Sequence, residues 1–174
     1  MTQNVFAIAV VLVVLLPAAW WVSHTRLVAA RSDVAGSWAD VDAELQRRHE
    51  LVPHLIEAVR SAAVHEQELL VDLAARNDDA TRSPDTPEAA TRFECPLTEA
   101  IERVVSLRER HPSLNSQRNF LELHQQLAIT EDRIAAARRY YNTRVERLNR
   151  RVEAFPSAIV ASRHGFTRAA FFET

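Results

Sequence analysis

The sequence has few of the residues that build tight turns and covalent cross-links. Its 174 residues include two Gly, one Cys and no Lys, so all 21 basic residues are Arg. Two Gly cannot supply the turns of a hairpin-rich β fold or a glycine-rich loop around a nucleotide phosphate. The single Cys95 excludes an intramolecular disulfide and a zinc site built on several thiolates. These absences favour an all-α protein.

Strong net charge is also absent. The formal net charge is −2, which gives the chain no general attraction to nucleic acid or to anionic lipid. Locally, the stretch from Arg138 to Arg151 contains six Arg and one acid, Glu146. A stretch of this charge could meet nucleic acid or anionic lipid headgroups. A solvated helix face balanced by acids on neighbouring helices is the favoured interpretation, so no nucleic-acid partner is predicted.

One long apolar run lies at the N-terminus. The 18 residues from Val5 to Val22 carry no charge, and Trp20 and Trp21 stand at one end of the run. A helix of this length, at 1.5 Å per residue, approaches the thickness of a bilayer core of about 30 Å. Tryptophan favours the membrane–water interface. Residues 1–25 are therefore predicted to anchor the chain in a lipid bilayer.

A cleaved signal peptide is the alternative interpretation of this run. It requires a positive N-terminal region and small residues at the cleavage site, whereas no Arg precedes the run and two Trp end it. A retained anchor fits better. Because Arg26 and Arg31 follow the run, the positive-inside rule predicts a single-pass cell-membrane protein, with its short N-terminus outside and residues 26–174 in the cytoplasm.

The remaining residues show the 3,4 apolar spacing of packed helices. One seam predicts a continuous helix, bent at Pro53, that ends near Asn77. The seam comprises Trp38, Val41, Leu45, Arg48, Val52, Leu55, Val59, Ala62, Glu66, Leu69 and Leu73. Residues 78–96, with three Pro among Asp, Ser and Thr, are predicted to form a linker.

Three further helices are predicted beyond this linker. The second begins with Pro96 in its first turn and stops near His111, because Pro112 disfavours helix before it. The third runs from about Ser113 to Phe155 with the same 3,4 spacing. A short fourth helix spans Ser157 to Arg163 and ends at Gly165. Together these predict three long helices and a short C-terminal helix in an antiparallel bundle.

Two charged residues, Arg48 and Glu66, occupy otherwise apolar seam positions. A buried charge is costly unless it is paired, so each should meet an opposite charge on another helix. Glu131, Arg138 and Arg144 on the third long helix are the candidate partners. The favoured interpretation is a structural polar layer that fixes helix register; the alternative is a polar cleft for a ligand.

The sequence does not match the zinc-protease or di-iron motifs that its residues suggest. His65-Glu66 begins a zinc-protease motif, but the required second His is replaced by Leu69. No Glu is followed by His three residues later, as paired di-iron sites require. The seven His are scattered and are interpreted as surface or packing residues. No enzyme activity, metal or cofactor is predicted.

The seam residues also belong to a longer set of motifs. From Trp38 the chain runs W-A-D-V-D-A-E-L-Q-R-R-H-E-L-V-P-H-L-I-E, and from Glu131 it runs E-D-R-I-A-A-A-R-R-Y-Y-N. Phe155-Pro156, Gly165-Phe166 and Phe171-Phe172-Glu173 follow in order. This sequence resembles the LemA family from Arg26 to the C-terminus. The resemblance implies a bacterial envelope protein with one transmembrane helix and an antiparallel helical bundle, without known catalytic residues.

Two functional hypotheses from different classes follow. The first is a non-enzymatic, membrane-anchored protein that scaffolds or regulates other membrane proteins, because an anchor and a long bundle are present without a recognisable site. The second is a ligand-binding or sensory bundle that uses the polar layer around Arg48 and Glu66. A cavity with converging polar groups at that layer would favour the second hypothesis. Neither the sequence nor the resemblance specifies an oligomeric state.

Overall fold

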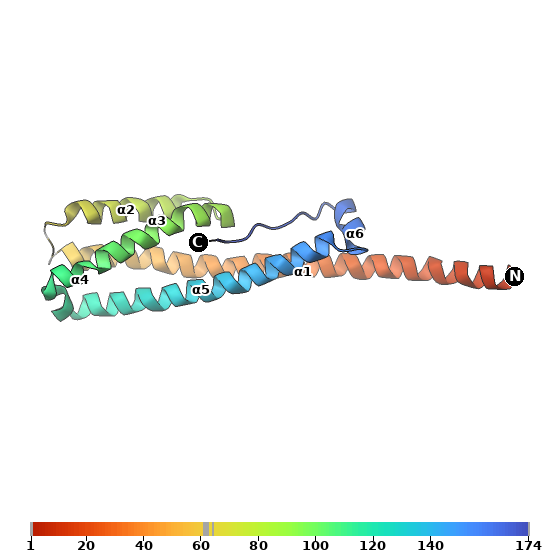
Figure 1. Ribbon diagram of the computed structural model, residues 1–174, viewed down its shortest axis with the longest axis horizontal. Coiled ribbons are helices and arrows are strands. Elements are labelled where there is room, and N and C mark those ends of the chain that lie inside the picture. The colour runs from red at the N-terminus through yellow and green to blue at the C-terminus, as the bar shows by residue number, and fades with distance from the viewer. Residues whose placement is uncertain (1, 61–62, 64, 174) are drawn as a thin grey trace. The chain divides into compact units, whose positions relative to one another are not determined.

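The computed structural model describes the backbone of residues 2–60, 63 and 65–173, with the side chains of residue 15 and of residues from 17 onward within that set (Figure 1). Every regular element among these residues is helical, which confirms the all-α class. The elements are α1 (Thr2–Arg60), α2 (Gln67–Arg82), α3 (Pro87–Val105), α4 (Leu107–Arg110), the 3₁₀-helix η1 (Pro112–Ser116), α5 (Arg118–Glu153) and α6 (Ser157–Arg163).

The helices fall into two compact units. Unit 1 comprises Met1–Ser37 and Asn142–Ala169, and unit 2 comprises Trp38–Tyr141 and Ala170–Thr174. Within unit 2 the C-terminal part of α1, then α2, α3 and the first part of α5, run in alternating directions (Figure 1). This arrangement confirms the antiparallel bundle, but the described residues form four long helices, α1, α2, α3 and α5, where three were predicted. The predicted boundary between residues 1–25 and 26–174 stays a prediction.

The predicted membrane anchor falls mainly on positions whose side chains are outside the described set. Helix α1 includes the run from Val5 to Val22 in its backbone, but the side chains of residues 2–14 and 16 are not described. Among the described residues, no helix combines the length and the apolar character needed to cross a membrane.

The prediction of one helix from Trp38 to Leu73 is wrong. Helix α1 continues through Pro53 but ends at Arg60, and the chain reverses before α2 begins at Gln67. Val59 and Leu73, on either side of the reversal, are both fully buried in the same core. The 3,4 spacing of apolar residues therefore continues from α1 into α2 without interruption at the turn. Neither Gly nor Pro lies between Arg60 and Gln67 to mark the turn in the sequence.

The predicted linker at residues 78–96 is also wrong, because most of it is helical. Helix α2 extends to Arg82, and α3 begins at Pro87 after a connection of residues 83–86. The hydroxyl of Thr86 accepts a hydrogen bond from the Ala89 N–H at 3.2 Å and caps α3. Proline is well suited to the position after such a cap. Pro96 lies inside α3 instead of starting a helix.

The predictions for the C-terminal half are closer to the structure. Helix α5 starts at Arg118 and ends at Glu153, so the predicted helix from Ser113 to Phe155 was too long at both ends. Phe155, predicted as the last apolar position of this helix, is 84% exposed. Helix α6 has the predicted bounds. Gly165 adopts φ +70° after α6, and the Phe166 N–H donates to the Ala161 carbonyl at 3.0 Å. This is the glycine-terminated helix end that the sequence predicts.

The main core lies in unit 2, where apolar side chains from α1 to α5 meet. Its largest fully buried members include Leu55, Leu73, Leu97, Leu107, Leu114 and Phe120. A second apolar group joins the C-terminal segment to the bundle: Phe172, only 1% exposed, lies 5.8 Å from the Trp38 ring. Tyr141 lies 5.3 Å from Trp38 and donates its hydroxyl to the Ala170 carbonyl at 2.8 Å. Burial, together with the charge of Glu88, raises the pKa of Tyr141 to about 12.

Candidate functional site

Arg48 is the buried centre of an ion cluster in unit 2. It lies on α1, is 2% exposed, and pairs with Glu94 of α3 and, at 2.9 Å, with Glu131 of α5. Arg48 Nη1, the nitrogen that bonds Glu131, also donates to the Thr98 hydroxyl at 2.8 Å. Charge-assisted hydrogen bonds to three side chains on two other helices fix the position of Arg48. The predicted burial of Arg48 and its pairing with Glu131 are confirmed.

Glu94 and His49 complete the cluster and were missed by the sequence analysis. The Glu94 side chain is 3% exposed, and its Oε1 lies 2.8 Å from His49 Nε2. Glu94 precedes Leu97, Ile101 and Val104 at the 3,4 spacing of a buried helix face. The assignment of residues 78–96 as a linker concealed this signal.

The environment of Glu94 favours its charged form. Burial by itself would raise the pKa of this carboxyl group, but the His49 hydrogen bond and the nearby charges of Arg48 and His49 outweigh the effect of burial. The resulting pKa lies below the ordinary value of 4.5. The folded chain therefore keeps Glu94 ionised at pH values where the unfolded chain begins to bind a proton.

This difference predicts an acid-dependent loss of stability. A carboxyl group whose pKa is depressed by folding stabilises the protein above its unfolded pKa, and the contribution disappears as the pH falls through the folded pKa. We expect the free energy of unfolding to fall as the pH drops below about 4.5, and to fall less steeply in Glu94→Gln. Urea denaturation of the full chain in mild detergent at several pH values measures both slopes. Identical slopes in the two proteins would contradict the prediction.

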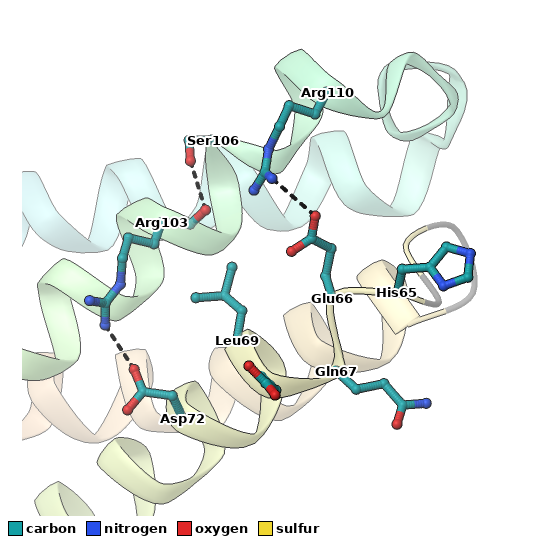
Figure 2. Close-up of a pocket in the computed structure, with 9 residues that line it drawn as sticks. His65, Glu66, Gln67, Leu69, Asp72, Arg103, Ser106 and Arg110 are labelled. Carbon is teal, nitrogen blue, oxygen red and sulfur yellow. Dashed lines mark hydrogen bonds and ion pairs between the residues drawn. The ribbon is translucent and has the colours of Figure 1, made fainter.

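Glu66 does not belong to the Arg48 cluster, which corrects the prediction of one shared polar layer. It precedes α2 and pairs with Arg110 at 3.2 Å and His111 at 3.5 Å, while its side chain remains 22% exposed. Figure 2 shows Glu66 directed toward Arg110, with a separate Arg103–Asp72 pair nearby. The turn between α1 and α2 removes Glu66 from the seam. Its predicted pairing with a cation from another helix is nevertheless confirmed.

Arg138 and Arg144, the other two residues predicted for the polar layer, do not belong to the Arg48 cluster. Arg138 is half-buried on α5, seven residues beyond Glu131, or about 10 Å along a helix. Arg144 belongs to unit 1, where it pairs with Asp33 at 3.3 Å. The cluster consists of Arg48, His49, Glu94, Thr98 and Glu131.

A cavity of about 310 Å³ lies beside Arg48, between α3, α4 and α5. Its apolar lining comes from Ile101, Val105, Leu127 and Ala128, and its polar lining from Arg48, Thr98, Glu102, Ser106, Arg108, Glu109, His124 and Glu131. Ligand sites typically combine apolar walls with a few fixed polar groups. A wider cleft of about 940 Å³ borders Glu66, but charged side chains of both signs dominate its lining (Figure 2).

Two buried polar atoms, one in the cluster and one on the residue before Glu131, form no hydrogen bond within the described part of the chain. The Nε of Arg48 and the hydroxyl of Thr130 are buried without a hydrogen-bond partner among the described residues. An unsatisfied buried donor is costly, and such atoms often mark a place where another molecule contributes. Among all the residues that the structure describes, no three His, Cys, Asp or Glu side chains are grouped so that they could hold a metal ion.

The sequence matches a known protein family. The model of the LemA family matches residues 37–174, most of the chain. The protein therefore belongs to the LemA family, as its motifs indicated. No curated protein matches the sequence.

Proposed function

We propose that this member of the LemA family is a membrane-anchored bundle that binds a small uncharged molecule beside Arg48, without catalysis. The main observation in support is the convergence of Arg48, Thr98 and Glu131 on a cavity with apolar walls. Its volume of about 310 Å³ lies at the lower end of the range for small-molecule sites. Because Arg48 is fixed by other helices, the cavity presents a pre-organised charged wall to a ligand.

The lining favours a neutral ligand with a hydrogen-bond acceptor. Three carboxylates, those of Glu102, Glu109 and Glu131, outnumber the two arginines of the lining and would repel an anion, while Arg48 and Arg108 oppose a cation. Burial lowers the pKa of His124, and the charge of Arg108 lowers it further, which favours the neutral imidazole. A hydroxyl or carbonyl oxygen of a neutral ligand could accept a hydrogen bond from Arg48 without being repelled by these carboxylates. The apolar walls would surround the rest of the molecule.

Three molecules with one ring and different polar groups test the proposal. Cyclohexanol, cyclohexanecarboxylate and cyclohexylamine would be offered to the full chain in lipid nanodiscs, with saturation-transfer NMR as the readout. We expect binding of cyclohexanol and loss of that binding in Ala128→Trp, which places a large ring at the cavity wall. Ala136→Trp, at another exposed position on α5, is the matched control. Equal binding to both variants would contradict the proposal.

We also propose that residues 1–25 are retained as the anchor. The support is the uncharged run from Val5 to Val22 and the bulky Trp pair at its end, where a cleaved signal peptide would require small residues. The intact mass of the membrane-extracted protein is expected to include the whole N-terminal segment. A mature chain beginning after Val22 would contradict retention.

The charges that flank the run support a cytoplasmic location for the rest of the chain. Cys95 is only partly exposed, so a better probe is Asp79→Cys, at an exposed position, in a Cys95→Ala background. A membrane-impermeant thiol reagent is expected to label this variant only after cell lysis. The Cys95→Ala protein without the new thiol is the control. Labelling in intact cells would place the bundle outside.

A second function, scaffolding or regulation of other membrane proteins, is favoured by a separate observation. Ile129 and Tyr140 of α5 are 43% and 49% exposed, and their separation of eleven residues, about three helical turns, puts them on nearly the same face. A photo-crosslinking amino acid at position 129 is expected to capture a membrane protein in cells. The same amino acid at exposed Asp79 provides the control. Equal capture from both positions would remove this support.

A further inference from the structure

Charge is distributed very unevenly between the two units. Unit 1 contains eight Arg and three acids, a net charge of +5, whereas unit 2 contains thirteen Arg and twenty acids, a net charge of −7. The net charge of −2 for the whole chain conceals this separation. The positive unit is also the one that includes the apolar run from Val5 to Val22.

Ring contacts hold the segment around α6 beside the end of that run. His164, directly after α6, lies 5.8 Å from Trp20 and 4.7 Å from His24, measured between ring centroids. Phe166 lies 6.0 Å from His24. Figure 1 shows α6 next to α1 in this unit. On the other side of the segment, Arg151 donates to the Arg26 carbonyl at 3.0 Å. Both ends of residues 155–166 therefore lie beside the part of α1 where a membrane-spanning helix would leave the hydrocarbon.

Large apolar side chains are exposed on this segment and at the end of the apolar run. Phe155 is 84% exposed and Ile159 is 54% exposed, while Trp21 at the end of the run is 71% exposed. Single exposed apolar residues are ordinary, but a group of them beside an apolar run marks an interaction surface. Arg163 is exposed on α6 four residues after Ile159, and therefore on the same helix face.

From this combination we propose that residues 155–166 dock onto the surface of an anionic phospholipid bilayer. Phe155 and Ile159 enter the interfacial region, and Arg163 and neighbouring arginines of unit 1 meet the headgroup phosphates. Basic residues next to apolar side chains are the usual means by which a segment lies on an anionic membrane. The proposal rests on the proposed anchor, which brings this segment to the surface. Unit 2, with its net negative charge, has no such attraction.

The test uses the full chain in nanodiscs of phosphatidylcholine, with or without phosphatidylglycerol. A polarity-sensitive fluorophore on Phe155→Cys, in a Cys95→Ala background, reports whether residue 155 meets lipid. We expect a blue-shifted emission in the anionic nanodiscs that is reversed by high salt. The same fluorophore on Leu121→Cys, at an exposed site in unit 2, should not respond to lipid charge.

Substitution of Arg163 tests the electrostatic contribution to docking on the bilayer. Arg163→Gln is expected to lower the docking equilibrium constant about fivefold, the effect of removing one cation near an anionic surface. Arg163→Lys should retain docking, and Arg118→Gln, at an exposed position in unit 2, should leave it unchanged. Equal docking in Arg163→Gln and wild type would overturn the proposed role of the arginine.

The outcomes separate docking from anchoring. A chain that resists alkaline extraction from membranes but shows no lipid-dependent emission retains its anchor and overturns the docking proposal. A chain that is extracted by alkali but binds phosphatidylglycerol vesicles, with a loss in Arg163→Gln, supports docking and contradicts the anchor. Preferential binding of a DNA duplex over phosphatidylglycerol vesicles, with the same loss in Arg163→Gln, would identify a nucleic-acid surface and overturn the lipid proposal.

Discussion

Replacing Arg48 with methionine is expected to lower the free energy of unfolding by about 3–5 kcal/mol, the usual cost of leaving a buried charge without its partner. Methionine preserves much of the apolar stem of arginine, so the loss reports the removed charge and hydrogen bonds. The Glu94 carboxylate, 3% exposed, would keep only His49 from the present cluster. Urea denaturation of the full chain in mild detergent, followed by circular dichroism, measures the change.

Arg82→Met provides the matched control. Arg82 lies on α2 with its side chain 77% exposed, and it pairs with Asp78 one helical turn earlier. Exposed pairs of this kind contribute little, so the free energy of unfolding should change by less than about 0.5 kcal/mol. Changes of equal size in Arg48→Met and Arg82→Met would mean that the Arg48 cluster is open to solvent.

A double variant distinguishes the cost of an unpaired charge from the value of the ion pair. Because a buried ion pair can often be exchanged for apolar side chains at little cost, Arg48→Met combined with Glu94→Leu should recover much of the lost stability. Non-additivity of this kind is expected for side chains in direct contact. Glu66→Ala should cost about 1 kcal/mol or less, since the pairs of Glu66 are solvent-accessible.

The second large effect is expected at the other end of the chain. Phe172→Ala should lower the free energy of unfolding by about 3–5 kcal/mol, the usual range for truncating a buried phenylalanine. The side chain is 1% exposed and packs against Trp38 although it lies two residues from the C-terminus of the printed sequence. Its loss would leave a cavity beside Trp38 and weaken the attachment of the C-terminal segment to unit 2.

The adjacent residue makes a sharp control. Phe171 is 39% exposed, so Phe171→Ala should cost clearly less than Phe172→Ala, although the two substitutions remove the same atoms. The same denaturation measurement applies to both. Equal losses from the two substitutions would show that the burial of Phe172 does not stabilise the bundle.

The sequence alone predicted the helical class and much of the buried surface. The 3,4 spacing identified the buried faces of α1 and α5, and the position of Arg48 in an apolar seam predicted its burial and its pair with Glu131. Gly165 and its surroundings gave the bounds of α6. These features were accessible because helix periodicity and helix ends depend on residues close together in the chain.

Tertiary structure decided the rest. The reversal between α1 and α2 left the apolar spacing in phase, so no local pattern separated two helices from one. Glu94 became a partner of Arg48, and Phe172 a partner of Trp38, only when segments distant in sequence were packed together. The cavity beside Arg48 arose in the same way, from α3, α4 and α5. A single sequence records which side chains prefer burial, but the partner that buries each one is selected by long-range packing.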